Sequence, residues 1–325
     1  MPLTLDRLAN APCSWGVVGR SGTSTSGMRM LDELVESGYR GTELGDPGFL
    51  PSEPDVLREA LGARDLTLLG GYVPLDLGAP SLTGEAREAV LRVARLLADA
   101  EPGARRPIVV LADQDGLDPH RVARAGRLTP QEGTPLRTLA RFGARLDEIA
   151  DLVDGETGLR VAVHPHVASR IERPEEVEGV LAASDPAKVG LVFDTAHYAY
   201  GTGREDVDGR LVLEGLDRFR DRIVTVHVKD CSREVAARAR SEAWGYERAV
   251  ARGLYAELGE GAIDVPAVLA QLEAFGYDDW LTVEQDVLPG MGTPLESATR
   301  NMRRMRAWLA EVATSRPGTA SPASR

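Results

Sequence analysis

Four of the five histidines in this chain are concentrated between residues 164 and 227, and acidic residues stand close to them. The polar residues occur in four short motifs: Val163-His-Pro-His166, Phe193-Asp-Thr-Ala-His197, Val226-His-Val-Lys-Asp230 and Thr282-Val-Glu-Gln-Asp286. Imidazole and carboxylate groups together suit Mn²⁺, Fe²⁺, Co²⁺ or Zn²⁺, whereas Mg²⁺ prefers a shell of oxygen atoms. The motifs therefore indicate a divalent-metal site with acid–base groups around it.

Each motif lies at the end of a run of apolar residues that should be deeply buried. A charge at the end of a buried strand is costly unless it is paired or bound to a metal. A single histidine in such a place is more often structural than a ligand. Here four consecutive predicted strands end in this way, and the coincidence predicts one ion, Mn²⁺ or Co²⁺ before Zn²⁺, Fe²⁺ or Mg²⁺. The predicted ligands are His164, Asp194, His227 and Glu284.

The elements that position these residues alternate between short apolar runs and longer segments of helical period. Several runs are apolar on successive residues, which is typical of strands buried on both faces of a parallel sheet. The predicted strands are Ala11–Gly16, Gly41–Gly45, Leu66–Val73, Pro107–Ala112, Leu159–His164, Val189–Asp194, Ile223–Lys229 and Trp280–Glu284. The predicted helices between them include Met28–Ser37, Glu85–Ala100, Leu136–Val153 and Val265–Phe275, and Gly38 and Gly276 stand where a helix stop is expected.

Eight strand–helix units predict an α/β fold, a single-domain (β/α)₈ TIM barrel in which right-handed crossovers join parallel strands. The alternative is an open doubly wound sheet. That fold usually carries a glycine-rich phosphate turn after its first strand, but the segment from Gly16 to Gly22 fits neither G-x-G-x-x-G nor a P-loop. We expect the barrel domain to span residues 1–312 and residues 313–325, rich in Ser, Pro, Ala and Thr, to form a disordered tail.

Two connections are long, Asp113–Thr134 and Asp230–Ala262. Loops that follow barrel strands build the active site, and long ones often act as lids. The stretch Arg233–Arg252 has a helical pattern, so the second connection is predicted to carry its own helix and to cover the site.

Composition narrows the function further. The 325 residues include 43% hydrophobic residues, enough for a large core, and the net charge of −12 argues against a nucleic-acid surface. Only Cys13 and Cys231 are present, which fits a reducing compartment. With no signal peptide and no membrane span, we expect a cytoplasmic protein that acts on a small molecule; whether it forms a homo-oligomer stays open.

On these residues the chain resembles the xylose-isomerase-like TIM barrel superfamily of sugar isomerases and epimerases, endonuclease IV and inosose dehydratases, over residues 8–312. The resemblance is strongest to the inosose dehydratase branch. It is carried by Ala11-Pro-Cys-Ser-Trp-Gly16, Gly41-Thr-Glu-Leu-Gly45, Val163-His-Pro-His166, Phe193-Asp-Thr-Ala-His197, Val226-His-Val-Lys-Asp230, Gly259-Glu-Gly261 and Trp280-Leu-Thr-Val-Glu284.

The resemblance implies that Asp194, His227 and Glu284 are metal ligands. Epimerases of the superfamily have glutamate as the fifth-strand ligand, where this chain has His164 or, two residues on, His166. They use one metal-bound glutamate on each face of the substrate. Because this chain keeps only Glu284 of that pair, the substitution favours dehydration of a keto-inositol or related polyhydroxy ketone over epimerisation of a keto-sugar.

The remaining candidates have weaker signals. Glu284 is the predicted base, and His166, His197 or Lys229 is the predicted acid or enolate-stabilising group; the structural alternative for Lys229 is a salt bridge with Asp230. Predicted substrate contacts are Glu43, Trp15 and His197. The alternatives are an ion pair for Glu43 and simple packing for Trp15. We expect Cys13 and Cys231 to be buried thiols and His120 to lie on the surface.

Three other functions are less compatible with the sequence than dehydration. A sugar isomerase or epimerase is the main alternative, and a phosphorylated substrate would require an anion site at the late loops that the sequence lacks. An endonuclease requires more metal ligands and a basic surface. A non-catalytic binding barrel does not require a nearly complete ligand set.

Overall fold

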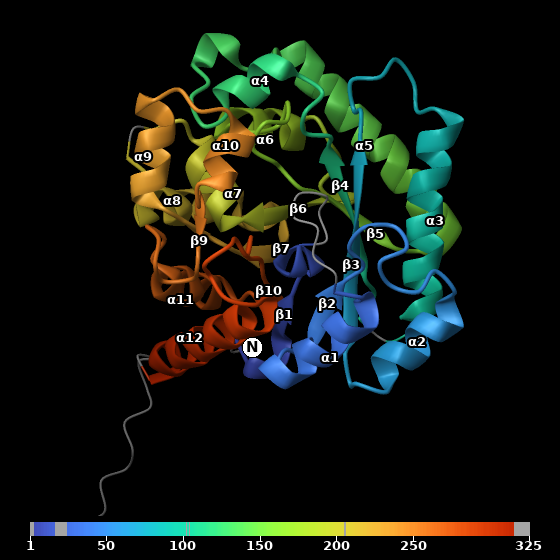
Figure 1. Cartoon of the computed structure of the whole chain (residues 1–325). Coiled ribbons are helices and arrows are strands. Elements are labelled where there is room, and N and C mark those ends of the chain that lie inside the picture. The colour runs from blue at the N-terminus through green and yellow to red at the C-terminus, as the bar shows by residue number, and fades with distance from the viewer. Residues whose placement is uncertain (1–2, 17–24, 102, 104, 205, 315–325) are drawn as a thin grey trace, which may run out of the picture.

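The computed structural model describes residues 3–16, 25–101, 103, 105–204 and 206–314, which form a closed barrel of parallel strands surrounded by helices (Figure 1). The order around the barrel is β1-β10-β7-β6-β5-β4-β3-β2, and every neighbouring pair is parallel. The strands are β1 (Leu8–Asn10), β2 (Gly41–Glu43), β3 (Thr67–Leu75), β4 (Ile108–Asp113), β5 (Arg160–Val163), β6 (Val189–Asp194), β7 (Ile223–Val228) and β10 (Leu281–Val283).

A long helix follows each strand and packs on the outside of the barrel. These helices are α1 (Gly27–Ser37), α2 (Pro54–Gly62), α3 (Gly84–Ala100), α5 (Leu136–Thr157), α6 (Pro174–Ala182), α8 (Gly209–Phe219), α11 (Val265–Phe275) and α12 (Pro294–Thr314). Gly38 and Gly276 follow α1 and α11 with φ of 96° and 77°, so both predicted helix stops are confirmed. The predicted barrel is confirmed and the open sheet is excluded.

The first strand is the one predicted strand that is wrong. Residues Pro12–Trp15 form the 3₁₀ helix η2 in place of the predicted strand, and β1 lies just before it. Proline at position 12 has no N–H to donate to a ladder, and the Ser14 hydroxyl donates back to Asn10 Oδ1 at 2.6 Å. The local turn therefore replaces the strand. The other 3₁₀ helices are η1 (Leu5–Arg7), η3 (Pro130–Glu132) and η4 (Arg220–Arg222).

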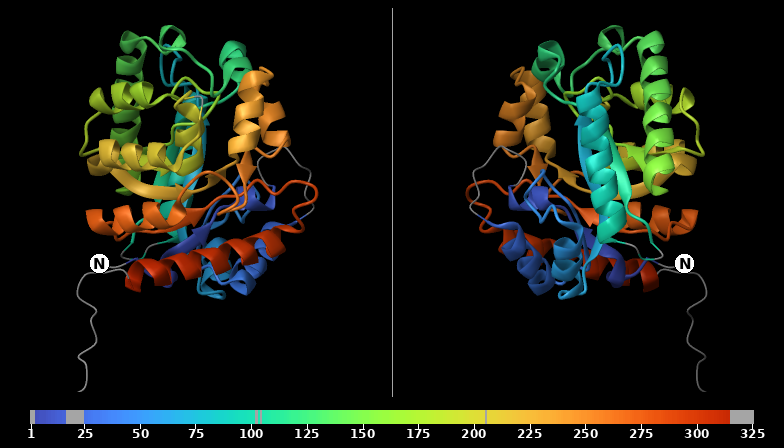
Figure 2. Two further views of the ribbon diagram at one scale, coloured as in Figure 1. Left: turned by 90° about the vertical axis from the view of Figure 1, so that its left-hand side faces the viewer. Right: turned by 90° about the vertical axis from the view of Figure 1, so that its right-hand side faces the viewer.

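Shorter elements extend the connections at the carboxyl ends of the strands. They are α4 (Pro119–Arg124), α7 (Thr195–Gly201), α9 (Arg233–Ser241), α10 (Tyr246–Ala251) and the antiparallel pair β8 (Asp230–Cys231) and β9 (Tyr255–Ala256). The single helix predicted for Arg233–Arg252 is two helices, because Ala243 has φ of 54° between them. Figures 1 and 2 show α4, α9 and α10 gathered at one end of the molecule, with α12 at the other end.

The core has an inner and an outer part. Inside the barrel, Ile108, Val110, Ala162 and Val192 form a small apolar cluster, and a far larger cluster fills the space between strands and helices. No helix in the described ranges is long and apolar enough to cross a membrane. The loop from Gly16 to Gly22 falls mostly on residues 17–24, outside the described residues, as does the predicted tail beyond Thr314.

Candidate active site and metal centre

The predicted site residues meet at the carboxyl rim of the barrel because all eight strands run the same way. His164 directly follows β5, Asp194 ends β6, and His227 lies on β7 as the register partner of Asp194. Glu284 directly follows β10, and its backbone N–H donates to Val228 O at 3.1 Å. Short buried strands thus bring four side chains from distant parts of the sequence to one rim, where Glu284 lies beside His227 but outside the group that the other three form.

Three of these side chains form a compact group of potential ligands. Each of His164, Asp194 and His227 offers one possible metal-ligand atom, and these three atoms lie within 4.8 Å of one another. All three residues are buried. The Asp194 carboxylate also caps α7, where Oδ1 accepts hydrogen bonds from the backbone N–H groups of Ala196 and His197 at 2.9 and 2.7 Å. These bonds to Oδ1 fix the carboxylate, while Oδ2 makes no hydrogen bond to the described residues.

Each member of this group has one buried atom without a hydrogen-bond partner among the described residues: His164 Nδ1, Asp194 Oδ2 and His227 Nδ1. Buried polar atoms are rarely left in this condition, because each costs about 1–3 kcal/mol. A divalent cation is a ligand that would satisfy two imidazole nitrogens and a carboxylate oxygen together. The donor set therefore fits a metal.

His227 is held between two carboxylates. Its Nε2 lies 3.0 Å from Glu43 Oε1 in a hydrogen bond, and its Nδ1 lies 3.0 Å from Glu284 Oε1 without hydrogen-bond geometry. Donation of Nε2–H to a carboxylate is the usual way of orienting a metal-binding histidine and leaves Nδ1 for the ion. The contact with His227 is the kind of ion pair expected for Glu43 if its role is structural.

Lys229 and Glu284 form a second part of the site. Lys229 Nζ lies 3.3 Å from Glu284 Oε2, 3.1 Å from Asp286 Oδ2 and 4.3 Å from the centre of the Tyr255 ring. The alternative partner suggested for Lys229, Asp230, is wrong. Asp230 instead accepts hydrogen bonds from the backbone of Cys231, Gly259, Gly261 and Ile263.

The charges of the site are strongly coupled. Burial would raise the pKa of Glu284, but His227 and Lys229 hold it well below its usual value. Burial would lower the pKa of Lys229, but Asp286 and Glu284 hold it well above its usual value. Glu284 is therefore a carboxylate and Lys229 an ammonium group at neutral pH. Burial raises the pKa of Asp194 to about 6 and lowers the pKa of His164 well below its usual value.

His166 and His197 lie next to each other, with ring centres 4.0 Å apart. His166 is partly exposed, its Nδ1 lies 2.7 Å from Val167 O, and its ring centre lies 6.0 Å from that of His164. His197 is buried on α7, and its Nδ1 accepts a hydrogen bond from Val167 N–H at 3.2 Å. Of the two fifth-strand histidines, only His164 belongs to the group of potential ligands.

The remaining predicted residues are distributed around the barrel. Trp15 is completely buried and donates its indole N–H to Glu33 Oε2 at 2.7 Å, as expected for the packing alternative. Cys13 and Cys231 are free, Cys231 buried and Cys13 partly exposed. His120 is exposed on α4, as predicted, and contacts Glu132.

Three residues at the site were not predicted from the sequence: Asp286, Tyr246 and Tyr255. Asp286 stands two residues after Glu284, and this spacing is the signal that could have identified it. The two tyrosines lie in the connection predicted to cover the site, and their hydroxyl oxygens are 3.1 Å apart. Only the long connection itself pointed to them.

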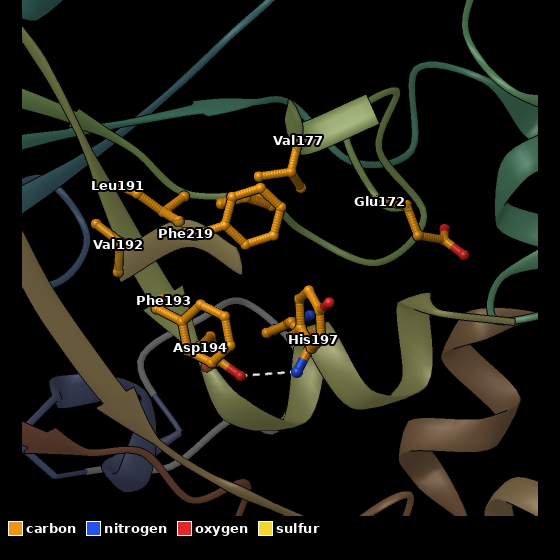
Figure 3. A pocket seen from close by; sticks show the side chains of 10 residues that line it. Glu172, Val177, Leu191, Val192, Phe193, Asp194, His197 and Phe219 are labelled. Atoms are coloured by element: carbon orange, nitrogen blue, oxygen red, sulfur yellow. Dashed lines mark hydrogen bonds between the residues drawn. The ribbon is translucent and has the colours of Figure 1, made fainter. Parts of the chain in front are cut away.

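A narrow apolar pocket lies behind Asp194 and His197 (Figure 3). Its walls come from β6 and helices α6, α7 and α8, including Val177, Phe193 and Phe219. Figure 3 shows the hydrogen bond between the Asp194 carboxylate and the His197 backbone beside this space, and Glu172 on a separate loop. Of the group of potential ligands, only Asp194 lines this pocket, and His164 and His227 do not.

Comparison with known proteins agrees with this geometry. The family model described as "Xylose isomerase-like TIM barrel" matches residues 31–311. The chain is 27% identical over 294 residues to an inosose dehydratase of Bacillus licheniformis, covering 89% of this chain and 91% of that protein. It is 32% identical over 311 residues to the rhizopine catabolism protein MocC of Rhizobium meliloti, covering 93% and 89%.

Among solved structures, the fold is similar to that of the IOLI protein with a binding zinc atom. The TM-score is 0.65 at 16% identity, and the similarity covers 94% of this chain and 99% of that one. The match to the family model extends over most of the chain and includes every strand from β2 to β10. It therefore contains all four predicted ligands of the site. This chain belongs to the xylose isomerase-like TIM barrel family.

Proposed function

We propose that the protein is a metal-dependent carbon–oxygen lyase that dehydrates a keto-inositol or a related polyhydroxy ketone. The observation that carries the proposal is the group of His164, Asp194 and His227 beside Glu284, at the mouth of a barrel related along most of its length to inosose dehydratases. Two histidines and two carboxylates next to a buried ammonium group supply the electrostatic and acid–base groups that an elimination requires.

The ion would be held by His164, Asp194, His227 and Glu284. Mn²⁺ or Co²⁺ suits this mixed nitrogen and oxygen set best, and Zn²⁺, Fe²⁺ or Mg²⁺ is the alternative. When bound, a divalent ion would act as a Lewis acid toward the carbonyl group of the substrate. Glu43 would hold the His227 ring in place from the opposite side.

Glu284 would remove the proton next to the substrate carbonyl. Its carboxylate is kept ionised by His227 and Lys229, and Lys229 Nζ at 3.3 Å fixes the orientation of Oε2. The electron pair of the broken C–H bond forms the new double bond, and negative charge develops on the carbonyl oxygen. The Lys229 ammonium group, which stays protonated, would stabilise that charge.

His166 has the best geometry among the proposed acids. It is partly exposed at the mouth, and donation of Nδ1–H to Val167 O leaves Nε2 to carry an exchangeable proton. The β-hydroxyl would accept that proton and leave as water, while the enolate re-forms the carbonyl and its carbon–carbon electron pair becomes the double bond to the β-carbon. His197 cannot deliver a proton from Nδ1, which accepts a hydrogen bond from Val167 N–H, and it is proposed instead as a hydrogen-bond donor to a substrate oxygen.

Epimerisation of a keto-sugar is the second candidate, and one observation favours it. Glu43 brings a second carboxylate to the site, 3.0 Å from His227 Nε2. An epimerase benefits from a base on each face of the carbon that it inverts. Glu43 and Glu284, however, both contact the same imidazole ring, each 3.0 Å from one of the two nitrogens of His227.

The substrate is expected to be uncharged. Lys229 at the site is paired with Glu284 and Asp286, and Arg170 is paired with Asp113 at the end of β4 and with Asp76. A small polyol therefore fits the site better than a phosphorylated sugar or a nucleic acid. We further propose a cytoplasmic location and one catalytic domain that spans residues 1–312, with Glu43 bordering the substrate site.

The experiment is to incubate the metal-loaded protein with a 2-keto-inositol and to follow the product by ultraviolet absorbance and mass. Loss of the mass of one water supports the lyase. A product of unchanged mass with an inverted or shifted centre replaces the lyase by the epimerase, and a chelated sample is the control for the metal.

A further inference from the structure

Two tyrosines of the long connection Asp230–Ala262 reach the site: Tyr246 beside His166, and Tyr255 beside His197 and Lys229. Tyr255 lies on β9, is almost completely buried, and is paired in register with Cys231 of β8. Its hydroxyl lies 3.2 Å from His197 Nδ1, and the face of its ring lies 4.3 Å from Lys229 Nζ. One side chain of the connection thus contacts two groups of the proposed mechanism.

The base of this connection is firmly anchored. Asp230, also fully buried, accepts four backbone hydrogen bonds, three of them from residues 259–263 beyond β9. Only glycine fits at position 261, because the Cβ atom of any other residue would lie 2.2 Å from the Asp230 carboxylate. Gln285 Nε2 also donates to Tyr255 O at 3.3 Å. The position of Tyr255 is therefore fixed by the barrel itself.

The hydrogen bonds around His197 define its tautomer. Val167 N–H donates to Nδ1 at 3.2 Å, so Nδ1 carries no hydrogen. Toward this nitrogen the Tyr255 hydroxyl at 3.2 Å can act only as a donor, sharing the single lone pair with Val167 N–H, and the Tyr246 hydroxyl at 3.1 Å can donate in turn to Tyr255. The remaining ring hydrogen is on Nε2, which has no hydrogen-bond partner among the described residues.

We propose that Tyr255 is a positioning residue that holds His197 as a neutral donor through Nε2–H and places the Lys229 ammonium group against its own ring. This inference rests on the proposed function for its catalytic consequence, and it adds the residue by which the covering connection acts on the chemistry. Tyr255 acts through His197 and Lys229 and has no role in proton transfer to the substrate.

The test compares Tyr255→Phe, which keeps the ring and removes the hydroxyl, with Tyr277→Phe. Tyr277 donates its hydroxyl to Trp280 O at 2.6 Å before β10, at the opposite end of the barrel, so it controls for the loss of a tyrosine hydrogen bond elsewhere. We expect kcat of Tyr255→Phe to fall about tenfold, with KM changed less than about threefold, and kcat of Tyr277→Phe to be unchanged. Equal kcat for Tyr255→Phe and wild type overturns the proposal.

A readout independent of turnover is the ¹⁵N NMR spectrum of the His197 ring at one fixed pH. We expect the hydrogen on Nε2 in the wild type, and in Tyr255→Phe a shift of the Nδ1 resonance toward that of a nitrogen that accepts fewer hydrogen bonds. An unchanged resonance overturns the proposal. If no keto-inositol is dehydrated by the wild type, the proposed function fails and this spectrum still decides the inference. If Tyr255→Phe does not fold, the spectrum of the wild-type protein decides: a His197 ring hydrogen on Nδ1 overturns the proposal, and one on Nε2 supports it.

Discussion

The buried atoms His164 Nδ1, Asp194 Oδ2 and His227 Nδ1 concentrate an energetic cost at the mouth of the barrel. Without a partner each costs about 1–3 kcal/mol, so the three together remove a sizeable part of the stability of an ordinary domain. A fold that retains such a cost usually uses it for binding or catalysis. A bound cation would remove this cost by coordinating all three atoms.

The first residue-scale prediction concerns the base. Glu284→Gln should lower kcat about 10²- to 10⁴-fold while KM changes only severalfold, because the carboxylate acts in the transition state more than in the ground state. Steady-state kinetics with measured metal content checks this, and Glu36→Gln on the exposed face of α1 is the control. An unchanged kcat with a raised KM would count against Glu284 as the base.

The second prediction is that metal affinity rises with pH. Burial raises the pKa of Asp194 to about 6, so its carboxyl group is protonated below that pH and cannot bind an ion. Burial would lower the pKa of His227, but Glu43 and Glu284 raise it, so a proton must also leave His227. Calorimetric titration with Co²⁺ should show the affinity falling about tenfold or more per pH unit below about pH 6. Equal affinity at about pH 5 and pH 7 would contradict this.

At this scale the sequence predicted which residues gather but not how they pair. His164, Asp194, His227 and Glu284 were identifiable because each ends an apolar run on successive strands. The pairing of Glu43 with His227, and of Lys229 with Asp286, depends on the closure of the barrel and on side-chain rotamers. Neither has a trace in local sequence periodicity, so the neighbouring Asp230 is the only ion-pair partner for Lys229 that the sequence suggests.

At the scale of elements, the connection Asp230–Ala262 forms a cover of two helices on a small hairpin. Its helix α10 contacts α4 of the other long connection, so two separate insertions meet at the same end of the barrel. Ser232 N–H donates to Leu254 O at 2.8 Å, which brings the two ends of the helical part together. The cover is therefore an insert that can be removed without separating β8 from β9.

We predict that replacing residues 233–252 with a two-residue turn lowers kcat/KM at least about tenfold, because Tyr246 is lost and water enters the site. The hairpin keeps Tyr255, so β8 and β9 provide the structural control, checked by circular dichroism and bound metal. If kcat/KM is unchanged in a folded variant, the two helices do not serve as a lid.

Glu172 joins the two loops that follow β4 and β5. Its carboxylate accepts hydrogen bonds from Gly126 N–H and Ala168 N–H, both at 2.8 Å, and Ala168 has φ of 70°. Glu172→Gln replaces one acceptor oxygen by a donor, so it should lower the free energy of unfolding by about 1–3 kcal/mol in urea titrations. The control is Glu178→Gln, which alters an exposed ion pair with Arg218. Equal effects of the two substitutions would exclude this role for Glu172.

Periodicity predicted most elements because buried parallel strands are apolar on successive residues and the helices end at glycine. It could not separate the strand Leu8–Asn10 from the turn that follows, since both are short and apolar. It also could not reveal the break between α9 and α10, because the left-handed residue there is Ala243, which carries no turn signal of its own.

At the scale of the whole molecule, metal binding and stability should be linked. A ligand present at about one hundred times its Kd stabilises the folded state by about 2.7 kcal/mol, which for a chain of this length raises Tm by about 5 °C. Differential scanning calorimetry with Mn²⁺ or Co²⁺ against a chelator checks this, and His164→Ala should lose most of the gain. No gain on adding either ion would argue against the metal site.

The pairing of β10 with both β7 and β1 has a consequence for synthesis on the ribosome. Until residues 281–283 emerge, the nascent sheet has two open edges, one at β1 and one at β7, and unpaired strand edges invite association between chains. Three residues near the carboxyl end close both edges at once. A messenger truncated before codon 281 should therefore yield an aggregating product, whatever the quality of the seven strands already made.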